Sequence, residues 1–305
     1  MKVLLAGATG AIGFPLLSAL AASGHEVIAV VRDPAKRRPV EERGARVVLA
    51  DVMDRDGLLR AVEGHAADVV MHQATALRDA RRKLTPDDPT VALRDRGTAH
   101  LLDAARAVGA RRFVTQSLIT GYGYRDHGDR LLTEDDAFGV RVGTVADLVT
   151  DSSVATERQV FAADGIEGIA LRYGMFYGPD AFSDLFASMM RKRAPVLPRG
   201  RTGTTSFVHV DDAASAAVAA MERGVGGEAY NIVDDEPMSW RDFLLAVAAA
   251  HGTPRPVVTP RWLLRLAVPY LGCLLIDTTM RISHAKATRD LGWRPAFRNV
   301  REGLS

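Results

Sequence analysis

Three glycines near the start of the chain have the spacing of a turn that binds phosphate groups. Gly7, Gly10 and Gly13 follow an apolar run over residues 3–6 and precede an apolar-periodic segment that predicts a helix. In such a turn the first glycine allows a tight bend, the second lets the backbone approach the phosphates, and the third lets the helix pack on the strand. The helix N-terminus then presents free N–H groups to negative charge. The sequence therefore predicts a cradle for the pyrophosphate of a dinucleotide.

The second predicted strand ends at a basic residue, which bears on the choice of cofactor. Enzymes that prefer NAD carry an acidic residue near this point, against the ribose 2′-hydroxyl. Here Arg32 comes first and Asp33 follows. A guanidinium pairs well with a 2′-phosphate, so Arg32 favours NADPH, while Asp33 leaves NADH open. Arg37 and Arg38, a few residues on, fit an ordinary solvated helix face.

Length and composition narrow the class of protein. The chain of 305 residues suffices for one α/β unit and a smaller appended region, and its 47% hydrophobic and 25% charged residues are typical of a soluble globular protein. The net charge of +2, with no basic run interleaved with aromatic residues, argues against a nucleic-acid partner. A single cysteine, Cys273, excludes an internal disulfide. We expect a cytoplasmic protein with no signal peptide, no membrane partner and, for want of metal-ligand spacing, no metal.

Strands and helices alternate through the first half of the chain. This alternation predicts an α/β fold with a Rossmann-type doubly wound parallel sheet. Strands are predicted at residues 3–6, 27–31, 46–49, 69–72, 113–116 and 168–172, with a long helix over Arg94–Val108.

After Arg172 the pattern loosens, and we predict a second, smaller and mostly helical region. Strands are expected at 207–210 and 230–233 and a helix at 211–222. The predicted organisation is a dinucleotide-binding domain over 1–172, to which 204–233 returns. A substrate-binding region is built from 173–203 and 234–305. Within it, the apolar segment 182–190 is expected to be a loop suited to a flat hydrophobic substrate.

Several motifs, in order along nearly the whole chain, resemble those of the extended short-chain dehydrogenase/reductases, the NAD-dependent epimerase/dehydratase group. They are GATGAIG (7–13), ADVMD (50–54), HQATAL (72–77), RRFVTQSLITGYG (111–123), LRYGMFYGP (171–179), SFVHVDDAASA (206–216) and KATRDLGWRP (286–295). The resemblance also implies a homodimer through the helices around Arg94–Val108 and Ser153–Ala163. With the glycine turn and Arg32, it implies these cofactor-binding residues: Gly7, Thr9, Gly10, Ala11, Ile12, Gly13, Arg32, Asp51, Val52, Ala74, Thr75, Ala76, Ser117, Tyr173, Gly174 and Met175.

The chain departs from this family in its proton-handling residues. In the family a tyrosine exchanges the proton at the carbonyl oxygen, and a lysine lowers the pKa of that tyrosine and holds the nicotinamide ribose. Counted back from Glu157, these positions fall on Val149 and Ser153, and no Tyr-x-x-x-Lys occurs anywhere. Leu118 stands where the family has its catalytic hydroxyl, and Arg94 replaces a family asparagine.

Hydride transfer without this dyad still needs a group that stabilises a developing alkoxide. The candidate catalytic residues are Ser117 and Thr120, through their hydroxyls, and Tyr122, through a water. A phenol beside the ketone of the substrate would supply an acid instead. The predicted function is an NADPH-dependent ketoreductase in antibiotic biosynthesis, acting on a hydrophobic, aromatic polyketide-like compound. Dyad-less tailoring ketoreductases of aromatic polyketides are similar in this respect.

Two other functions stay open. A catalytically silent NADP-binding sensor or interaction protein explains the lost dyad as simply. A nucleotide-sugar epimerase or dehydratase would need a rebuilt acid/base site. Such enzymes carry an arginine for the diphosphate just before the strand at 207–210, where this chain has Thr205 and Ser206, with Arg201 nearby.

Overall fold

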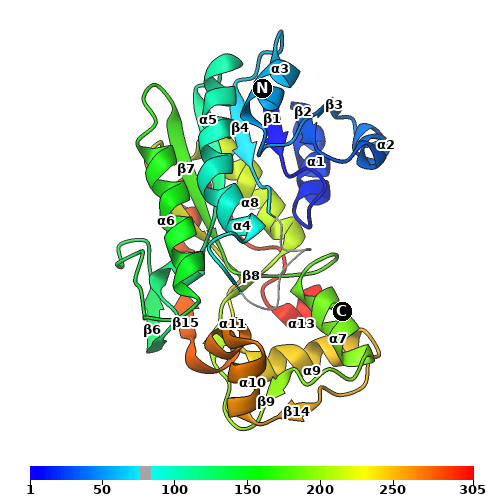
Figure 1. Ribbon diagram of the computed structural model, residues 1–305, viewed down its shortest axis with the longest axis vertical. Helices are drawn as coiled ribbons and strands as arrows, with labels where there is room; N and C mark the ends of the chain where they lie inside the picture. Colours follow the sequence, from blue (N-terminus) through cyan, green and yellow to red (C-terminus); the bar gives the residue numbers. More distant parts are fainter. Residues whose placement is uncertain (76–83) are drawn as a thin grey trace.

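A parallel sheet of seven strands forms the centre of the computed structural model, which describes residues 1–75 and 84–305 (Figure 1). The strand order is β12-β7-β5-β4-β1-β2-β3, and every neighbouring pair is parallel. This confirms the predicted fold class. The strands are β1 (Lys2–Ala6), β2 (Glu26–Val31), β3 (Arg46–Leu49), β4 (Val69–His72), β5 (Arg112–Leu118), β7 (Glu167–Tyr173) and β12 (Ala229–Ile232).

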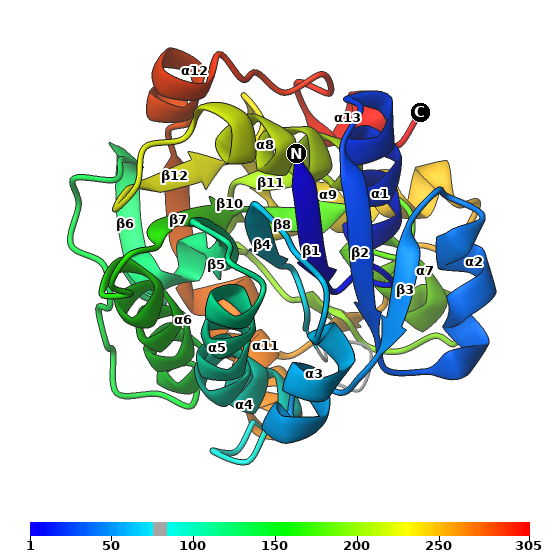
Figure 2. The same cartoon turned by 90° about the horizontal axis from the view of Figure 1, so that it is seen from above.

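Helices cover both faces of this sheet, as the view from above shows (Figure 2). Their apolar stripes bury against the strands, with one hydrophobic cluster on each face. On one face lie α1 (Gly13–Ala22) and α8 (Val210–Arg223). On the other lie α3 (Arg55–Val62), α5 (Thr98–Ala107) and α6 (Asp147–Phe161). Beyond β2 follow η1 (Pro34–Lys36) and α2 (Arg37–Glu41). The homodimer through α5 and α6 stays a prediction.

The long helix predicted over residues 94–108 is interrupted near its start. After α4 (Pro89–Ala92) comes a π-helical turn, Leu93–Gly97, and only then α5. Two hydroxyls hold the widened turn in place, because Thr98 Oγ1 and Thr156 Oγ1 donate to the Arg94 carbonyl oxygen at 2.6 and 2.7 Å. Such turns are rare and concentrate at functional sites.

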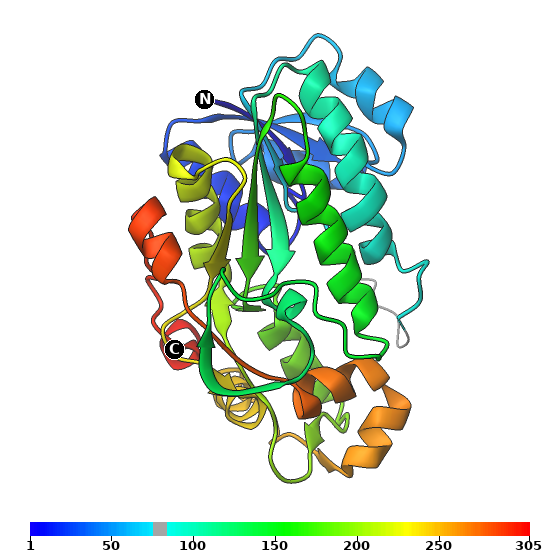
Figure 3. The same ribbon diagram turned by 90° about the vertical axis from the view of Figure 1, so that its left-hand side faces the viewer.

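The strand arrowheads point toward a second region that packs below the sheet (Figure 3). It contains four short two-stranded pairings and several helices around an aromatic cluster in which Phe207 and Phe243 stack at 4.4 Å. The parallel pairs are β8 (Met175–Tyr177) with β11 (Phe207–His209), β6 (Asp126–Leu132) with β15 (Thr279–Ile282), and β9 (Leu197–Pro198) with β14 (Val258–Thr259). The antiparallel pair is β10 (Thr204–Thr205) with β13 (Met238–Ser239).

The helices of this region include one that sequence analysis expected to be a loop. Residues 182–190 belong to α7 (Phe182–Arg191), and the loop prediction is wrong. Phe182, Phe186 and Met190 recur every four residues, and the Phe186 ring packs edge-on against Trp240. The other helices of this region are α9 (Trp240–Ala250), α10 (Arg261–Ala267), α11 (Pro269–Gly272), the π turn Cys273–Asp277 and α13 (Val300–Gly303), whereas α12 (Ala285–Leu291) packs against α8 and β12 beside the sheet. In the described part of the chain, no helix has the length and apolar character needed to cross a membrane.

Candidate active site

The chain reverses its direction of travel across the sheet next to β1, which has β2 on one side and β4 on the other. Ligands of doubly wound sheets bind outside the carboxyl ends of the strands at such a point. Here β1 ends at Ala6 and β4 at His72, and the Gln73 amide donates to the Ala6 carbonyl at 2.8 Å. The predicted glycine turn begins at this point, immediately after β1.

The three glycines of the turn meet different surroundings. Gly7 has a φ of +97°, and a Cβ there would lie 2.4 Å from the carbonyl carbon of Gln73. A Cβ on Gly13 would lie 2.2 Å from the Gly7 carbonyl oxygen. At Gly10 the same oxygen, at 3.4 Å, is all that a Cβ would meet within 4 Å. Packing inside the protein therefore requires Gly7 and Gly13 to be glycine, whereas a Cβ on Gly10 would have no close contact with the described residues.

The N-terminus of α1 offers donors to an anion. No side chain caps it at Ile12, and no acidic residue lies in its first turn. The preceding residues Thr9, Gly10 and Ala11 are only partly buried. The turn and helix therefore fit the pyrophosphate of a dinucleotide, whose charge the helix dipole would stabilise, although the Gly13 amide donates to the Gly10 carbonyl at 3.0 Å and Pro15 has no N–H.

The basic residues after β2 fall into two groups: Arg32, which has no ion pair with a described residue, and Arg37 and Arg38, which form ion pairs on a helix face. Arg32 is exposed and forms no ion pair with any described residue. Asp33 caps η1, because its Oδ1 accepts a hydrogen bond from the Ala35 amide at 2.9 Å. Arg37 and Arg38 each pair at 2.8 Å with the glutamate four residues on, along an exposed helix face.

The next predicted cofactor residues follow the ends of β3 and β4. They differ in how far contacts within the protein already hold them. The Asp51 carboxylate accepts from the Met53 amide at 2.9 Å, and Val52 is buried beside it. Ala74 and Thr75 follow β4 and are half-buried, whereas Ala76 lies outside the described residues.

The three predicted cofactor residues after β7 are held by contacts within the protein. The Tyr173 side chain is fully buried in the core behind the sheet. The amides of Gly174 and Met175 donate to the carbonyls of Ile232 and Ser206, both at 3.0 Å. These residues could therefore contact a cofactor only through atoms other than the Tyr173 side chain and the backbone N–H groups of Gly174 and Met175.

Tyr122 belongs to a buried hydrogen-bond network. Its hydroxyl donates to Asn231 Oδ1 at 2.9 Å and accepts from Arg172 Nη1 at 3.0 Å. Arg172 in turn forms two hydrogen bonds to the Glu157 carboxylate, at 2.9 and 2.8 Å, and lies 3.7 Å over the Phe138 ring. Burial raises the pKa of Tyr122 to about 12. Its proton is donated to Asn231 in this arrangement, and the role of Tyr122 as a donor through a water stays a prediction.

The two positions that the sequence comparison predicts for the dyad, Val149 and Ser153, lie one turn apart on α6. Val149 and Ser153 are both buried, and Ser153 Oγ donates to the Val149 carbonyl at 2.9 Å. A valine has no exchangeable side-chain proton, and this serine hydroxyl is used within its own helix. Helix α6 contains no tyrosine and no lysine.

Several buried polar side-chain atoms have no hydrogen-bond partner among the described residues. Among them are Ser117 Oγ, Thr120 Oγ1, Thr150 Oγ1, Arg94 Nε and both amide atoms of Gln73. These come from the ends of β4 and β5, from η4 (Ile119–Tyr122), from α6 and from the π turn. Each such group costs roughly 1–3 kcal/mol, so a cluster of them indicates a place that a ligand completes. The candidates Ser117 and Thr120 belong to it, while sequence reasoning did not single out Gln73 and Thr150.

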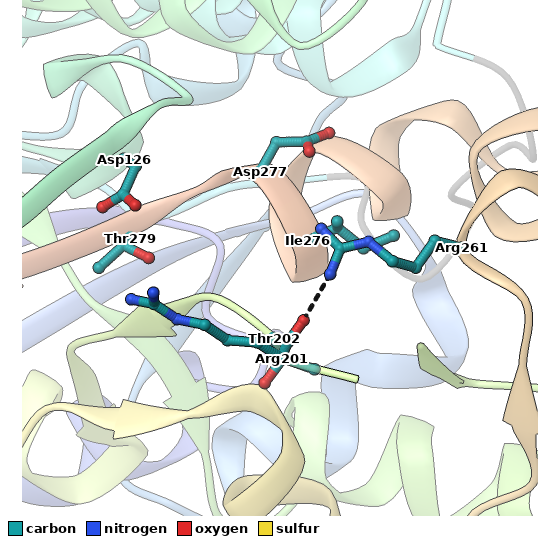
Figure 4. A pocket seen from close by; sticks show the side chains of 7 residues that line it. All are labelled: Asp126, Arg201, Thr202, Arg261, Ile276, Asp277 and Thr279. Carbon is teal, nitrogen blue, oxygen red and sulfur yellow. Dashed lines mark hydrogen bonds between the residues drawn. The ribbon is translucent and has the colours of Figure 1, made fainter. Parts of the chain in front are cut away.

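A hollow of about 200 Å³ lies in the lower region and includes Arg201 (Figure 4). Arg261 Nη1 donates to the Arg201 carbonyl at 2.8 Å, and the carboxylates of Asp126 and Asp277 also line the hollow. Two carboxylates beside the arginines disfavour a diphosphate there. Within the described residues, no group of His, Cys, Asp and Glu side chains could hold a metal ion.

Comparison with known proteins gives this site its context. The model of the NAD dependent epimerase/dehydratase family matches residues 3–233. The chain is 40% identical to a 3-diazoavenalumate denitrifying reductase of a Streptomyces species, covering 100% of this chain and 99% of that protein. It is 29% identical to a 4-hydroxy-2-methyl-3-oxo-4-farnesyl-3,4-dihydroquinoline-1-oxide ketoreductase of Stigmatella aurantiaca, over 95% and 85%. The Thermus thermophilus UDP-glucose 4-epimerase complex with NAD superposes with a TM-score of 0.77 at 25% identity, over 100% and 96%.

Proposed function

The chain belongs to the NAD dependent epimerase/dehydratase family, and from this premise we propose that it reduces an aromatic compound without supplying a proton from the protein. It is an NAD(P)-dependent oxidoreductase, similar over its full length to a reductase and over most of it to a ketoreductase. The observation that carries the proposal is the proton-handling site. Val149 and Ser153 occupy the dyad positions, and the Tyr122 hydroxyl is committed to Asn231.

A diazo substrate satisfies this condition best. In an arenediazonium ion the C–N bond breaks, dinitrogen leaves, and a hydride equivalent gives the new C–H bond, so charge and atoms balance without a net proton. A ketone instead needs one hydride and one proton to reach the alcohol. The relative at 40% identity is named for a diazo substrate and for the removal of nitrogen from it. We propose the same class of reaction for this chain.

A ketone that carries its own acid is the second candidate substrate. A phenol beside the carbonyl would neutralise the developing alkoxide, and the unpartnered hydroxyls of Ser117 and Thr120 would add hydrogen bonds to it. Similarity to the Stigmatella ketoreductase supports this candidate. Both candidates share the central feature, because neither draws on a tyrosine of the protein.

The cofactor we propose is NADPH, which supplies the hydride when bound. Residues 7–13 would hold its pyrophosphate, and Ala74, Thr75 and Ser117 would line its nicotinamide half. The exposed guanidinium of Arg32 is free to pair with a 2′-phosphate. Asp33 is already used as a helix cap, which weakens the case for NADH.

The test is product formation from matched substrates. Wild-type protein with NADPH and para-carboxybenzenediazonium should give benzoate and dinitrogen. One NADPH should be oxidised for each benzoate formed, once the rate measured without protein has been subtracted. Gly10→Ala, which is expected to fold and to bind NADPH at least tenfold more weakly, is the control for adventitious reduction. An absence of protein-dependent NADPH oxidation with the diazonium salt and with ortho-hydroxyacetophenone would overturn the proposal in favour of a silent NADP-binding protein.

A further inference from the structure

Arg94 is a buried cation without a carboxylate partner among the described residues. It is 3% exposed, and its Nη1 donates a long hydrogen bond of 3.4 Å to Ser152 Oγ, while Nε has no partner. Burial lowers the pKa of Arg94. Taking a charge out of water without pairing it destabilises a folded protein, so such a group calls for a partner that residues 1–75 and 84–305 do not provide.

The backbone fixes the position from which this side chain extends. Arg94 lies in the π turn, where hydroxyls of Thr98 and Thr156 hold its carbonyl oxygen from two helices. Its side chain reaches Ser152 on α6, the helix that carries the vacated dyad positions. The guanidinium therefore lies beside the place where the family keeps its proton-handling groups.

Two phenols accompany Arg94 on the substrate side of the crevice. The hydroxyls of Tyr124 and Tyr270 lie 3.0 Å apart. Burial raises the pKa of both phenols, and the charge of Arg94 lowers it, so the three groups are close enough to act on one another. Tyr270 belongs to α11, in the region below the sheet, away from the glycine turn.

The charge of the Asp88 carboxylate acts on Arg94, but this carboxylate forms its hydrogen bond elsewhere. Asp88 favours the charged form of Arg94, but it lies beyond the 4.0 Å of an ion pair. Its Oδ1 accepts from the Thr90 amide at 2.9 Å and caps α4. No described carboxylate therefore pairs with the Arg94 guanidinium, and the hydroxyl pair of Tyr124 and Tyr270 offers further polar groups to an anion.

We propose that Arg94, together with the hydroxyls of Tyr124 and Tyr270, binds a carboxylate group of the substrate. A guanidinium matches the two oxygens of a carboxylate in a bidentate pair. The inference rests on the proposed function, because it takes the crevice to hold a reducible aromatic compound. The acidic end of that compound then lies against α6 and α11, and its reducible group lies toward Ser117 and the glycine turn.

The experiment is a binding comparison that needs no turnover. Calorimetry in the presence of NADPH would measure the affinities of para-acetylbenzoate and its uncharged match, para-acetylbenzamide. Wild-type protein should bind the carboxylate at least tenfold more tightly. Arg94→Met should abolish that preference and leave amide affinity, NADPH affinity and the melting temperature unchanged or raised, while Arg94→Lys should restore part of the preference. Tyr270→Phe should weaken carboxylate binding several-fold.

Other outcomes would overturn the inference. The first is that the wild type binds the two probes with equal affinity, and the second is that the preference for the carboxylate survives in Arg94→Met. The third is that Arg94→Met loses affinity for NADPH, which would assign this residue to the cofactor. A carboxylate preference without any NADPH oxidation would refute only the proposed reductase function. Turnover of a diazonium salt or ketone without a carboxylate preference would refute only the role of Arg94.

Discussion

Alanine at two glycines of the same turn should have opposite consequences. A Cβ at Gly13 would lie 2.2 Å from the Gly7 carbonyl oxygen and 2.4 Å from the Ala8 carbonyl carbon. Both are backbone atoms, and both distances are at least 1 Å shorter than an ordinary 3.4 Å contact. The turn must therefore shift, and overpacking of this kind costs roughly 1–3 kcal/mol or more. Gly13→Ala should lower the melting temperature by several degrees.

Gly10→Ala should leave the fold intact and weaken cofactor binding. The new Cβ would meet just one atom within 4 Å, at 3.4 Å, so the free energy of unfolding should change by less than about 1 kcal/mol. The methyl group would instead occupy the space through which the pyrophosphate approaches. A tenfold or greater loss of NADPH affinity, about 1.4 kcal/mol, is expected.

Two assays separate these effects: thermal unfolding without cofactor, and fluorescence titration with NADPH. The two variants are matched, because each adds one methyl group to the same turn. NADPH affinity at the wild-type level in Gly10→Ala would refute the assignment of this turn to the pyrophosphate. Wild-type stability in Gly13→Ala would refute the packing argument.

Three further predictions concern buried charge and cofactor choice. Glu157→Gln leaves the Arg172 cation buried without its carboxylate, so urea unfolding should show a loss of about 3–5 kcal/mol; a loss below about 1 kcal/mol would argue against this pair. Burial raises the pKa of Asp234 from 3.8 to about 9, so the folded state keeps a proton that the unfolded chain releases above about pH 4. This carboxyl should therefore lower the free energy of unfolding as pH rises from about 4 to 9, by up to about 1.4 kcal/mol per pH unit. In urea unfolding at several pH values, Asp234→Asn should make this decline less steep. An unchanged slope would contradict the raised pKa of Asp234. Arg32→Ala should weaken NADPH binding about tenfold or more and leave NADH binding unchanged, since one charge-assisted contact to the 2′-phosphate is lost; equal losses for both cofactors in titration would refute the role of Arg32.

The central sheet could be predicted from sequence because its strands are buried on both faces. Such strands are nearly continuous apolar runs, as at residues 27–31 and 69–72, and the structure places strands there. The two wrong or incomplete elements have local causes. Helix α7 was predicted as a loop although its apolar residues follow a four-residue spacing. The π turn interrupts the predicted long helix through hydroxyl contacts to the Arg94 carbonyl, one of them from α6, which is distant in sequence.

The candidate site divides in the same way between local and distant contacts. The glycine turn is local, so spacing alone locates it. The commitment of Tyr122 to Asn231 joins residues 109 positions apart, and the Tyr124–Tyr270 contact joins residues 146 apart. No periodicity or motif reports such pairs. Sequence reasoning therefore identified the loss of the dyad and the replacement by Arg94, but not the environment that gives Arg94 a role.

The most direct test of the account is the rate of NADPH oxidation with three substrates under identical conditions. Two need no acid from the protein: para-carboxybenzenediazonium and ortho-hydroxyacetophenone. The third, acetophenone, has no neighbouring acidic group. The account predicts protein-dependent reduction of one or both of the first two and none of acetophenone. Full turnover of acetophenone would contradict it, because the protein would then supply a proton that the described site does not offer.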